Sequence, residues 1–148
     1  MIFRSSVIVF VALLFAAPAI HGEVRIDDPW VRATVAQQKA TGAFMKITST
    51  ADARLLEIRS ALAGTAEIHE MRLDGDRMKM RAISSLALPA GVTVELKPGG
   101  FHIMLLELSA QVKESDTVPL SLIIETANGE RETIDIDAPA RPLRKQGH

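Results

Sequence analysis

The amino-acid sequence predicts an all-β domain, an antiparallel sandwich or barrel of roughly seven to nine strands. Two observations lead to this fold class. Apolar residues alternate with polar ones at a period of two, and turn-forming residues interrupt that alternation at short intervals. No long stretch shows the 3.6-residue period of an amphipathic helix, and no segment is repeated. The 148 residues suffice for one domain with a hydrophobic core.

The expected strands follow one another along the chain, each with a row of side chains that faces inward. These rows are Ala43, Met45 and Ile47; Val92, Val94 and Leu96; Phe101, Ile103 and Leu105; Val118, Leu120, Leu122 and Ile124; and Ile134 and Ile136. Turns are expected at Asp74-Gly75, Pro89-Ala90-Gly91, Lys97-Pro98-Gly99-Gly100, Ser115-Asp116 and Asn128-Gly129.

The two ends of the chain are expected to lie outside this domain. Residues 1–19 resemble a secretory signal peptide: Arg4 is followed by an apolar run and then by small residues, which favours cleavage after Ala19, with Gly22 as an alternative. The β-domain itself, with its candidate metal-binding residues, is then expected to span residues 23–138. Residues 139–148, with two prolines and several charges, are expected to form a flexible tail.

Composition excludes several classes of function. The formal net charge is -1, and removal of Arg4 with the signal gives -1 - 1 = -2, so no basic surface indicates a nucleic-acid partner. No nucleophile elbow, paired carboxylates or phosphate-binding loop indicates an enzyme. The chain has no cysteine, so methionine and histidine are its only soft or borderline metal ligands. A soluble mature form is expected, because no further segment is apolar enough to span a bilayer.

Three short elements carry the candidate chemistry. Residues two apart on a strand point to the same face, so each element is expected to present a pair of metal-binding side chains on one face. The pairs are His69 with Met71, Met78 with Met80, and His102 with Met104. Met45 lies in an inward-facing row and is interpreted as core filling.

A tight turn between the first two elements predicts how they pair. With Asp74 and Gly75 as the central residues of a two-residue hairpin, the register follows by counting outward. That register places Leu73 opposite Asp76, Met71 opposite Met78, His69 opposite Met80 and, on the other face, Glu70 opposite Lys79. Directly opposed residues have Cβ atoms about 4.5–5.5 Å apart, close enough for two side chains to reach one ion.

Such a donor set favours copper(I). Thioether sulfur is soft and uncharged and imidazole is borderline, whereas Mg²⁺, Ca²⁺ and Mn²⁺ prefer oxygen. Zinc prefers cysteine, histidine and carboxylate. Met71 and Met78 have two interpretations that remain open: they shield the ion with apolar bulk, or they serve as additional sulfur ligands.

The spacing of these residues resembles the PCuAC-type periplasmic copper(I) chaperones. That family's motif is a histidine, ten residues, a methionine, twenty-one residues and then His-x-Met; His69, Met80, His102 and Met104 match it at every position. The resemblance extends over nearly the whole mature chain and includes the segment Val94-Glu95-Leu96-Lys97-Pro98-Gly99-Gly100.

The resemblance implies a cupredoxin-like fold and a periplasmic protein that is not an enzyme. It implies one Cu(I) per chain, held by His69, Met80, His102 and Met104. The implied partners are the CuA subunit of cytochrome c oxidase, as copper acceptor, and a thioredoxin-like copper chaperone.

Other functions stay open at this point. The protein could buffer copper or confer copper resistance instead of delivering the ion, or it could be a structural β-module without metal. A blue-copper electron-transfer site is excluded, because it requires a cysteine thiolate. An amine-plus-imidazole copper site would require His21 to become the first residue of the mature chain. His148 is left without a role.

Overall fold

A computed structural model describes residues 22–142, which form ten strands and contain no helix. The expected signal peptide, 1–19, and residues 143–148 of the expected tail lie outside the described residues. No helix in the described part of the chain is long and apolar enough to cross a membrane. The strands are β1 Val24–Arg32, β2 Ala40–Ser49, β3 Ala53–Arg59, β4 Ala63–Asp74, β5 Arg77–Ile83, β6 Leu86–Leu88, β7 Thr93–Leu96, β8 His102–Leu108, β9 Thr117–Thr126 and β10 Arg131–Arg141.

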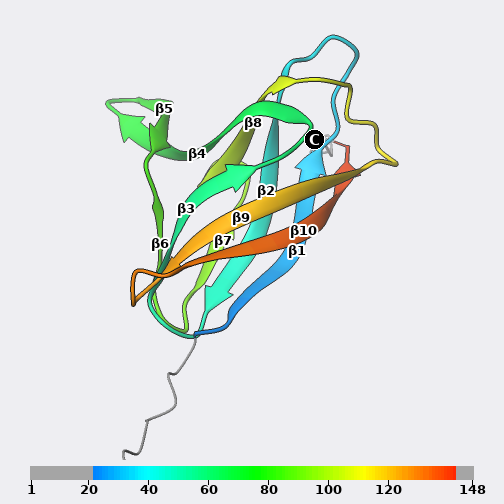
Figure 1. The fold of residues 1–148 in the computed structure, drawn as a ribbon. Coiled ribbons are helices and arrows are strands. Elements are labelled where there is room, and N and C mark those ends of the chain that lie inside the picture. Colours follow the sequence, from blue (N-terminus) through cyan, green and yellow to red (C-terminus); the bar gives the residue numbers. More distant parts are fainter. Residues whose placement is uncertain (1–21, 143–148) are drawn as a thin grey trace, which may run out of the picture.

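The strands form a two-layered sandwich whose layers join along one side (Figure 1). One sheet holds β5, β4, β8, β2 and β1 in that order, with β7 also paired to β2; the other holds β10, β9, β3 and β6. β1 and β10 connect the two, and theirs is the one parallel pairing of the described strands. The all-β prediction is confirmed. Ten strands are present instead of seven to nine; the shortest, β6, has three residues and is not among the predicted rows.

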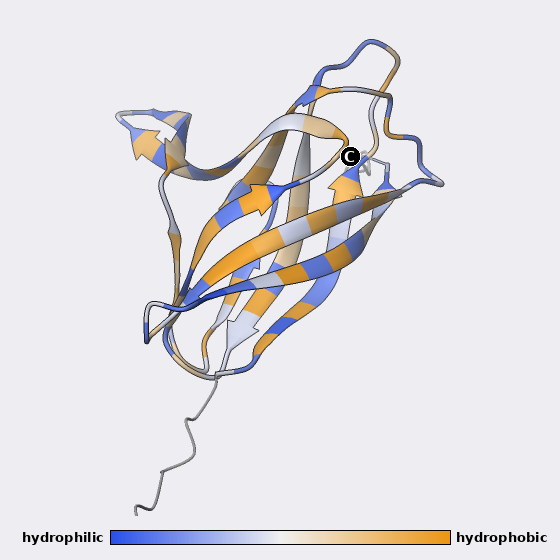
Figure 2. Ribbon diagram, in the orientation of Figure 1, coloured by the Kyte–Doolittle hydropathy of each residue, from blue (hydrophilic) through white to orange (hydrophobic). Residues whose placement is uncertain are grey.

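The core lies between the two sheets and follows the period-two pattern of the sequence. Hydrophobic and hydrophilic colours alternate along the strands in Figure 2, as expected when one side of each strand is buried. The fully buried residues include Met45, which is 2% exposed, together with Ile103 and Leu105 on β8. Val92 is an exception to the predicted rows: it precedes β7, lies in a turn and is exposed.

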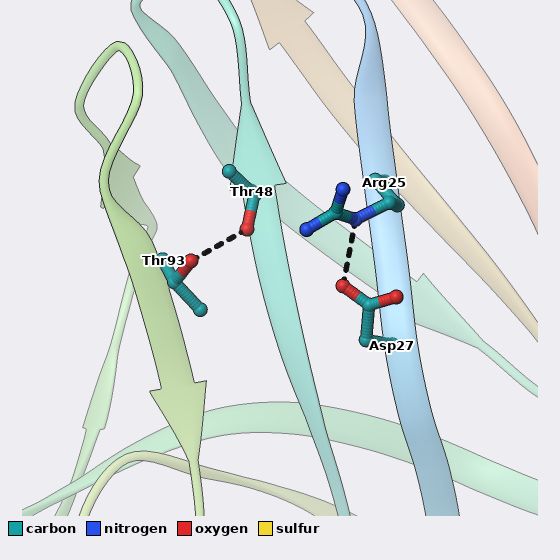
Figure 3. Close-up of polar contacts among 4 residues, drawn as sticks. All are labelled: Arg25, Asp27, Thr48 and Thr93. Atoms are coloured by element: carbon teal, nitrogen blue, oxygen red, sulfur yellow. Dashed lines mark hydrogen bonds and ion pairs between the residues drawn. The ribbon is translucent and has the colours of Figure 1, made fainter.

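Strand β2 is the centre of the sheet that carries the candidate site. It pairs with β1 on one side and with β7 and then β8 on the other. Figure 3 shows polar contacts at this part of the sheet: the Thr48 and Thr93 hydroxyls lie 2.8 Å apart across β2 and β7, and Arg25 binds Asp27 along β1. β2 is therefore paired with other strands along both of its edges.

The predicted start of the C-terminal tail, at residue 139, lies too early in the chain. β10 continues through Pro139 and Ala140 to Arg141, because the end of this strand pairs in parallel with β1, Ala140 with Val31. Ala138 and Ala140 are buried. The side chain of Pro139, between these two residues, is exposed.

Candidate metal centre

The two candidate histidines lie side by side on the outer face of the sheet. β4 and β8 pair antiparallel, and their register places His69 directly opposite His102. The ring centroids are 5.5 Å apart, with an interplanar angle of 63°. His102 is only 5% exposed, so the imidazole pair forms the floor of the candidate site.

Met104 extends the site along β8. It lies two residues beyond His102, whereas Ile103 between them is fully buried in the core, so the two candidate ligands share the outer face as predicted. Across the sheet, Met104 is paired with Glu67 on β4 and with Gly42 on β2. Gly42 has no side chain, and the Phe44 ring occupies the space that a Cβ at this position would take.

The β4–β5 hairpin contributes Met80, in a register that differs from the predicted one. The turn residues are Gly75 and Asp76, and Asp74 pairs with Arg77. Gly75 has a φ of +63°, whereas Asp76 is not among the residues with positive φ, a pattern typical of a type II′ turn with glycine at its first central position. The predicted turn placed glycine second.

The observed register changes which residues of β4 and β5 lie opposite one another, but not the face of the sheet on which each residue lies. Met71 lies opposite Met80 instead of Met78, and His69 lies opposite Ala82. On the other face Glu70 lies opposite Arg81, to which it is bound at 2.6 Å, instead of Lys79. Because the pairing moved by two residues, the histidines and methionines stay on one face.

The candidate ligands open onto a cleft of about 340 Å³. Met71, Met80, His102 and Met104 line it, and His69 lies behind them against the His102 ring. Met80 is 51% exposed, on the outermost strand of its sheet. Figure 1 shows the hairpin of β4 and β5 projecting from the body of the sandwich. The site therefore has a buried imidazole side and an open thioether side.

A hydrogen bond to one ring nitrogen of His102 leaves the other nitrogen free to bind a metal. Its Nδ1 lies 2.9 Å from the carbonyl oxygen of Gly100, which only accepts, so Nδ1 carries the proton and donates. The lone pair is then on Nε2. The loop before β8 makes this contact possible by turning sharply at Gly99, where φ is +84°.

His69 is oriented by a carboxylate. Its Nε2 donates to Glu67 Oε2 at 2.6 Å, which leaves the lone pair on Nδ1. Nδ1 is buried and has no hydrogen-bond partner among the described residues. A buried acceptor without a partner costs free energy, and a bound metal ion would remove that cost. This unpaired nitrogen fits a metal ligand.

Substitution of Glu67 by glutamine is expected to weaken metal binding about 10- to 100-fold. The amide would no longer fix the tautomer of His69 or increase the basicity of the ring. The measurement is the dissociation constant for Cu(I) in competition with a chromophoric chelator. Glu70→Gln is the matched control, because Glu70 pairs with Arg81 on the other face of the hairpin. Equal affinities for both variants would contradict a role for Glu67.

The donor types narrow the choice of metal. Within residues 22–142, no group of three or more His, Cys, Asp or Glu side chains is placed to hold a metal ion. A metal at this cleft would therefore take sulfur from methionine in addition to imidazole nitrogen, a set that suits Cu(I) and not zinc.

Aromatic side chains that no sequence motif predicted adjoin the cleft. The Phe44 ring lies 6.5 Å from the His102 ring and 4.5 Å from the Trp30 ring, between centroids. A Cβ at Gly42 would lie 2.6 Å from Cζ of Phe44, so glycine is needed for the ring to lie there. The available signal was a large apolar residue at an outward-facing position of β2.

The LpqE-like family matches the chain over residues 24–139. Protein Lxx21020 of Leifsonia xyli subsp. xyli (strain CTCB07), whose name carries a lipoprotein designation, is 30% identical over 100 residues. These residues are 67% of this chain and 60% of that protein, so the chain spans about three fifths of the curated relative it matches.

Solved structures with the same fold include copper-binding domains. The copper-bound PCuAC domain from PmoF2 matches with a TM-score of 0.67 at 22% identity, over 83% of this chain and 99% of that domain. Apo-DR1885 from Deinococcus radiodurans matches with a TM-score of 0.61 at 23% identity, over 98% of this chain and 99% of its own. The Cu(I) form of DR1885 matches with a TM-score of 0.62, over 90% and 85%. The fold is thus the PCuAC-type β-sandwich, and the chain belongs to the LpqE-like family.

Proposed function

We propose that this protein is a copper(I) carrier that holds one Cu(I) ion through His69, Met80, His102 and Met104. The observation that carries the proposal is the imidazole pair. Its two rings lie 5.5 Å apart, and in each ring a hydrogen bond occupies one nitrogen and leaves the other free. Met80 and Met104 line the cleft beside them.

Two further observations support copper as the cargo. Thioether and imidazole donors together favour Cu(I) over the divalent metals that prefer oxygen or thiolate. The fold is shared with a copper-bound PCuAC domain and with the Cu(I) form of DR1885. A carrier of this kind performs no catalytic step, so the protein is proposed to be a binding protein and not an enzyme.

The arrangement suits transfer by ligand exchange. His69 and His102 belong to β4 and β8, which are held by neighbours on both sides, whereas β5 is paired only with β4. Met80 is also the most exposed of the four proposed ligands, so an incoming donor displaces its thioether first while the imidazoles retain the ion. The ion then leaves when further donors of the acceptor replace Met104 and the histidines.

The acceptor is proposed to be the CuA centre of cytochrome c oxidase, with a thioredoxin-like copper chaperone as a second partner, in the periplasm. The family resemblance and the spacing of the four ligands support this destination. Copper buffering or resistance is the second candidate function, since an open Cu(I) site also serves storage.

The test is an anaerobic titration of the mature protein with Cu(I) in competition with a chromophoric Cu(I) chelator, with Zn(II) as comparison. Binding at one Cu(I) per chain, with no comparable retention of Zn(II), is the expected result. A protein that cannot retain Cu(I) against a weak chelator would disprove the proposal. Mixing the loaded protein with an isolated copper-free CuA domain, followed by one-electron oxidation with ferricyanide, then separates delivery from buffering. Only delivered copper gives the mixed-valence CuA absorption spectrum after that oxidation.

A further inference from the structure

Arg32, the last residue of β1, lies at the rim of the same cleft as the proposed copper ligands. Its guanidinium carbon is 5.4 Å from the centre of the Phe44 ring. Its Nε is buried and has no hydrogen-bond partner among residues 22–142, and none of the ion pairs among those residues includes it. A buried donor without an acceptor is costly, so this position favours an anionic ligand.

A second arginine, Arg141, adds to the positive charge beside Arg32. Arg141 on β10 is the register partner of Arg32, so two like charges are adjacent on neighbouring strands, an arrangement that is unfavourable without a counter-charge. Asp28 binds Arg141 at 2.7 Å, and this hydrogen bond holds the pKa of the Asp28 carboxyl below its usual value. Asp28 therefore compensates Arg141, and Arg32 has no such partner.

Apart from His102, the other polar side chains of the cleft are already hydrogen-bonded. Gln38 donates to the carbonyl of Ala40 at 2.8 Å and accepts from the backbone N–H of Val35 at 3.3 Å. The Thr41 hydroxyl donates to the carbonyl of Arg32 at 2.7 Å. Arg32 is the cleft residue whose side chain has a buried polar atom without a partner, and it lies on an aromatic surface that extends to His102.

We propose that Arg32 is a docking residue that binds a carboxylate side chain of the protein with which copper is exchanged. This inference rests on the proposed function. A guanidinium binds a carboxylate through two parallel hydrogen bonds, which fixes both the position and the orientation of the incoming group. The cleft would then receive the carboxylate at Arg32 and the partner's metal donors beside Met80 and Met104.

The expected consequence is kinetic. A rim charge mainly increases the rate of productive encounter and makes that rate dependent on salt, whereas it adds little to the affinity for the ion itself. Because Arg32 is not among the four proposed ligands, its replacement should leave the dissociation constant for Cu(I) nearly unchanged and slow the transfer to acidic acceptors.

The experiment compares two small acceptors for Cu(I) bound to the full protein. Bicinchoninate carries carboxylates, and neocuproine is an uncharged chelator. Arg32→Gln is expected to slow removal of Cu(I) by bicinchoninate about fivefold at low salt, and the difference should disappear at about 0.5 M salt. Removal by neocuproine should be unchanged. The matched control is Arg54→Gln, because Arg54 lies on β3 in the other sheet.

Equal rates for the wild type and Arg32→Gln with bicinchoninate would overturn the proposal, as would an equal slowing with neocuproine. If the protein does not hold Cu(I), the proposed function fails, and the docking role is tested in the metal-free protein. There, a tetraglutamate peptide should shift the NMR resonances of the Arg32 side chain and the Phe44 ring, an effect that is lost in Arg32→Gln and kept in Arg54→Gln. Absence of any shift in the wild type would contradict an anion site at Arg32.

Discussion

Replacement of Met80 and Met104 together by alanine is expected to weaken Cu(I) binding by at least about 100-fold. The loss of a metal ligand should cost at least as much affinity as the loss of a residue that only orients a ligand. Both sulfurs would be absent from the cleft, and His69 and His102 alone leave Cu(I) with two donors. Met80 is half exposed and Met104 lies on the outer face, so the variant should keep its fold. Anaerobic competition with a chromophoric chelator measures the loss.

The matched control for this double variant is Met71→Ala with Met78→Ala. It removes the same atoms from the same face of the chain, and Met71 also lines the cleft. The expected loss of affinity is much smaller, because neither methionine is among the four proposed ligands. The corrected hairpin also places Met78 opposite Leu73, two register positions farther from the histidines than the Met71–Met80 pair. If the two double variants lose affinity equally, the assignment of Met80 and Met104 as the sulfur ligands is wrong.

Met45→Ala is expected to destabilise the protein by about 2–5 kcal/mol, the usual cost of truncating a large buried side chain. Met45 is almost fully buried on β2, the central strand of its sheet. Truncation of its side chain leaves a cavity in the core between the two sheets. The measurement is denaturant unfolding of the metal-free protein. Met78→Ala is the control: its side chain is 54% exposed, and the expected change is within about 0.5 kcal/mol.

The copper affinity of folded Met45→Ala should equal that of the wild type, because its side chain points away from the cleft. The two predictions therefore separate methionine in the core from methionine at the site. A Met45→Ala protein of wild-type stability, or one that loses copper affinity while folded, would contradict the division of roles inferred from burial.

The sequence predicted which face each candidate ligand occupies, but not which residues oppose one another. Facing depends only on the period of two, so His69, Met80, His102 and Met104 were assigned to one face correctly. The hairpin register depends on the position of glycine in the turn. Asp74-Gly75 and Gly75-Asp76 are both reasonable two-residue turns, and only the backbone conformation distinguishes them.

The direct pairing of His69 with His102 could not be derived from local patterns. It depends on β4 lying next to β8, strands that are far apart in the sequence, and single-sequence periodicity contains no information on which strands are neighbours. The same reason accounts for Phe44 and Arg32. Each lies near the candidate site because β1 and β2 follow β8 in the sheet, and neither carries a motif of its own.

The C-terminal boundary was misplaced for a related reason. Prolines and charges after Ala138 are typical of a tail, but pairing of β10 with β1 keeps three more residues in the sheet. Composition describes what a segment prefers in isolation, whereas here a distant strand supplies the hydrogen bonds that decide its conformation.

The pairing of the first strand with the last also governs when the molecule can finish folding. Contacts between residues so distant along the chain require a large loop to close, and proteins that depend on them fold slowly. Since β1 pairs with β10 where Val31 is beside Ala140, a chain whose last strand is still emerging from a ribosome or a membrane channel cannot complete the sandwich. Arg32 and Arg141 come together in the same event, so the proposed docking residue is in place only in a fully folded chain.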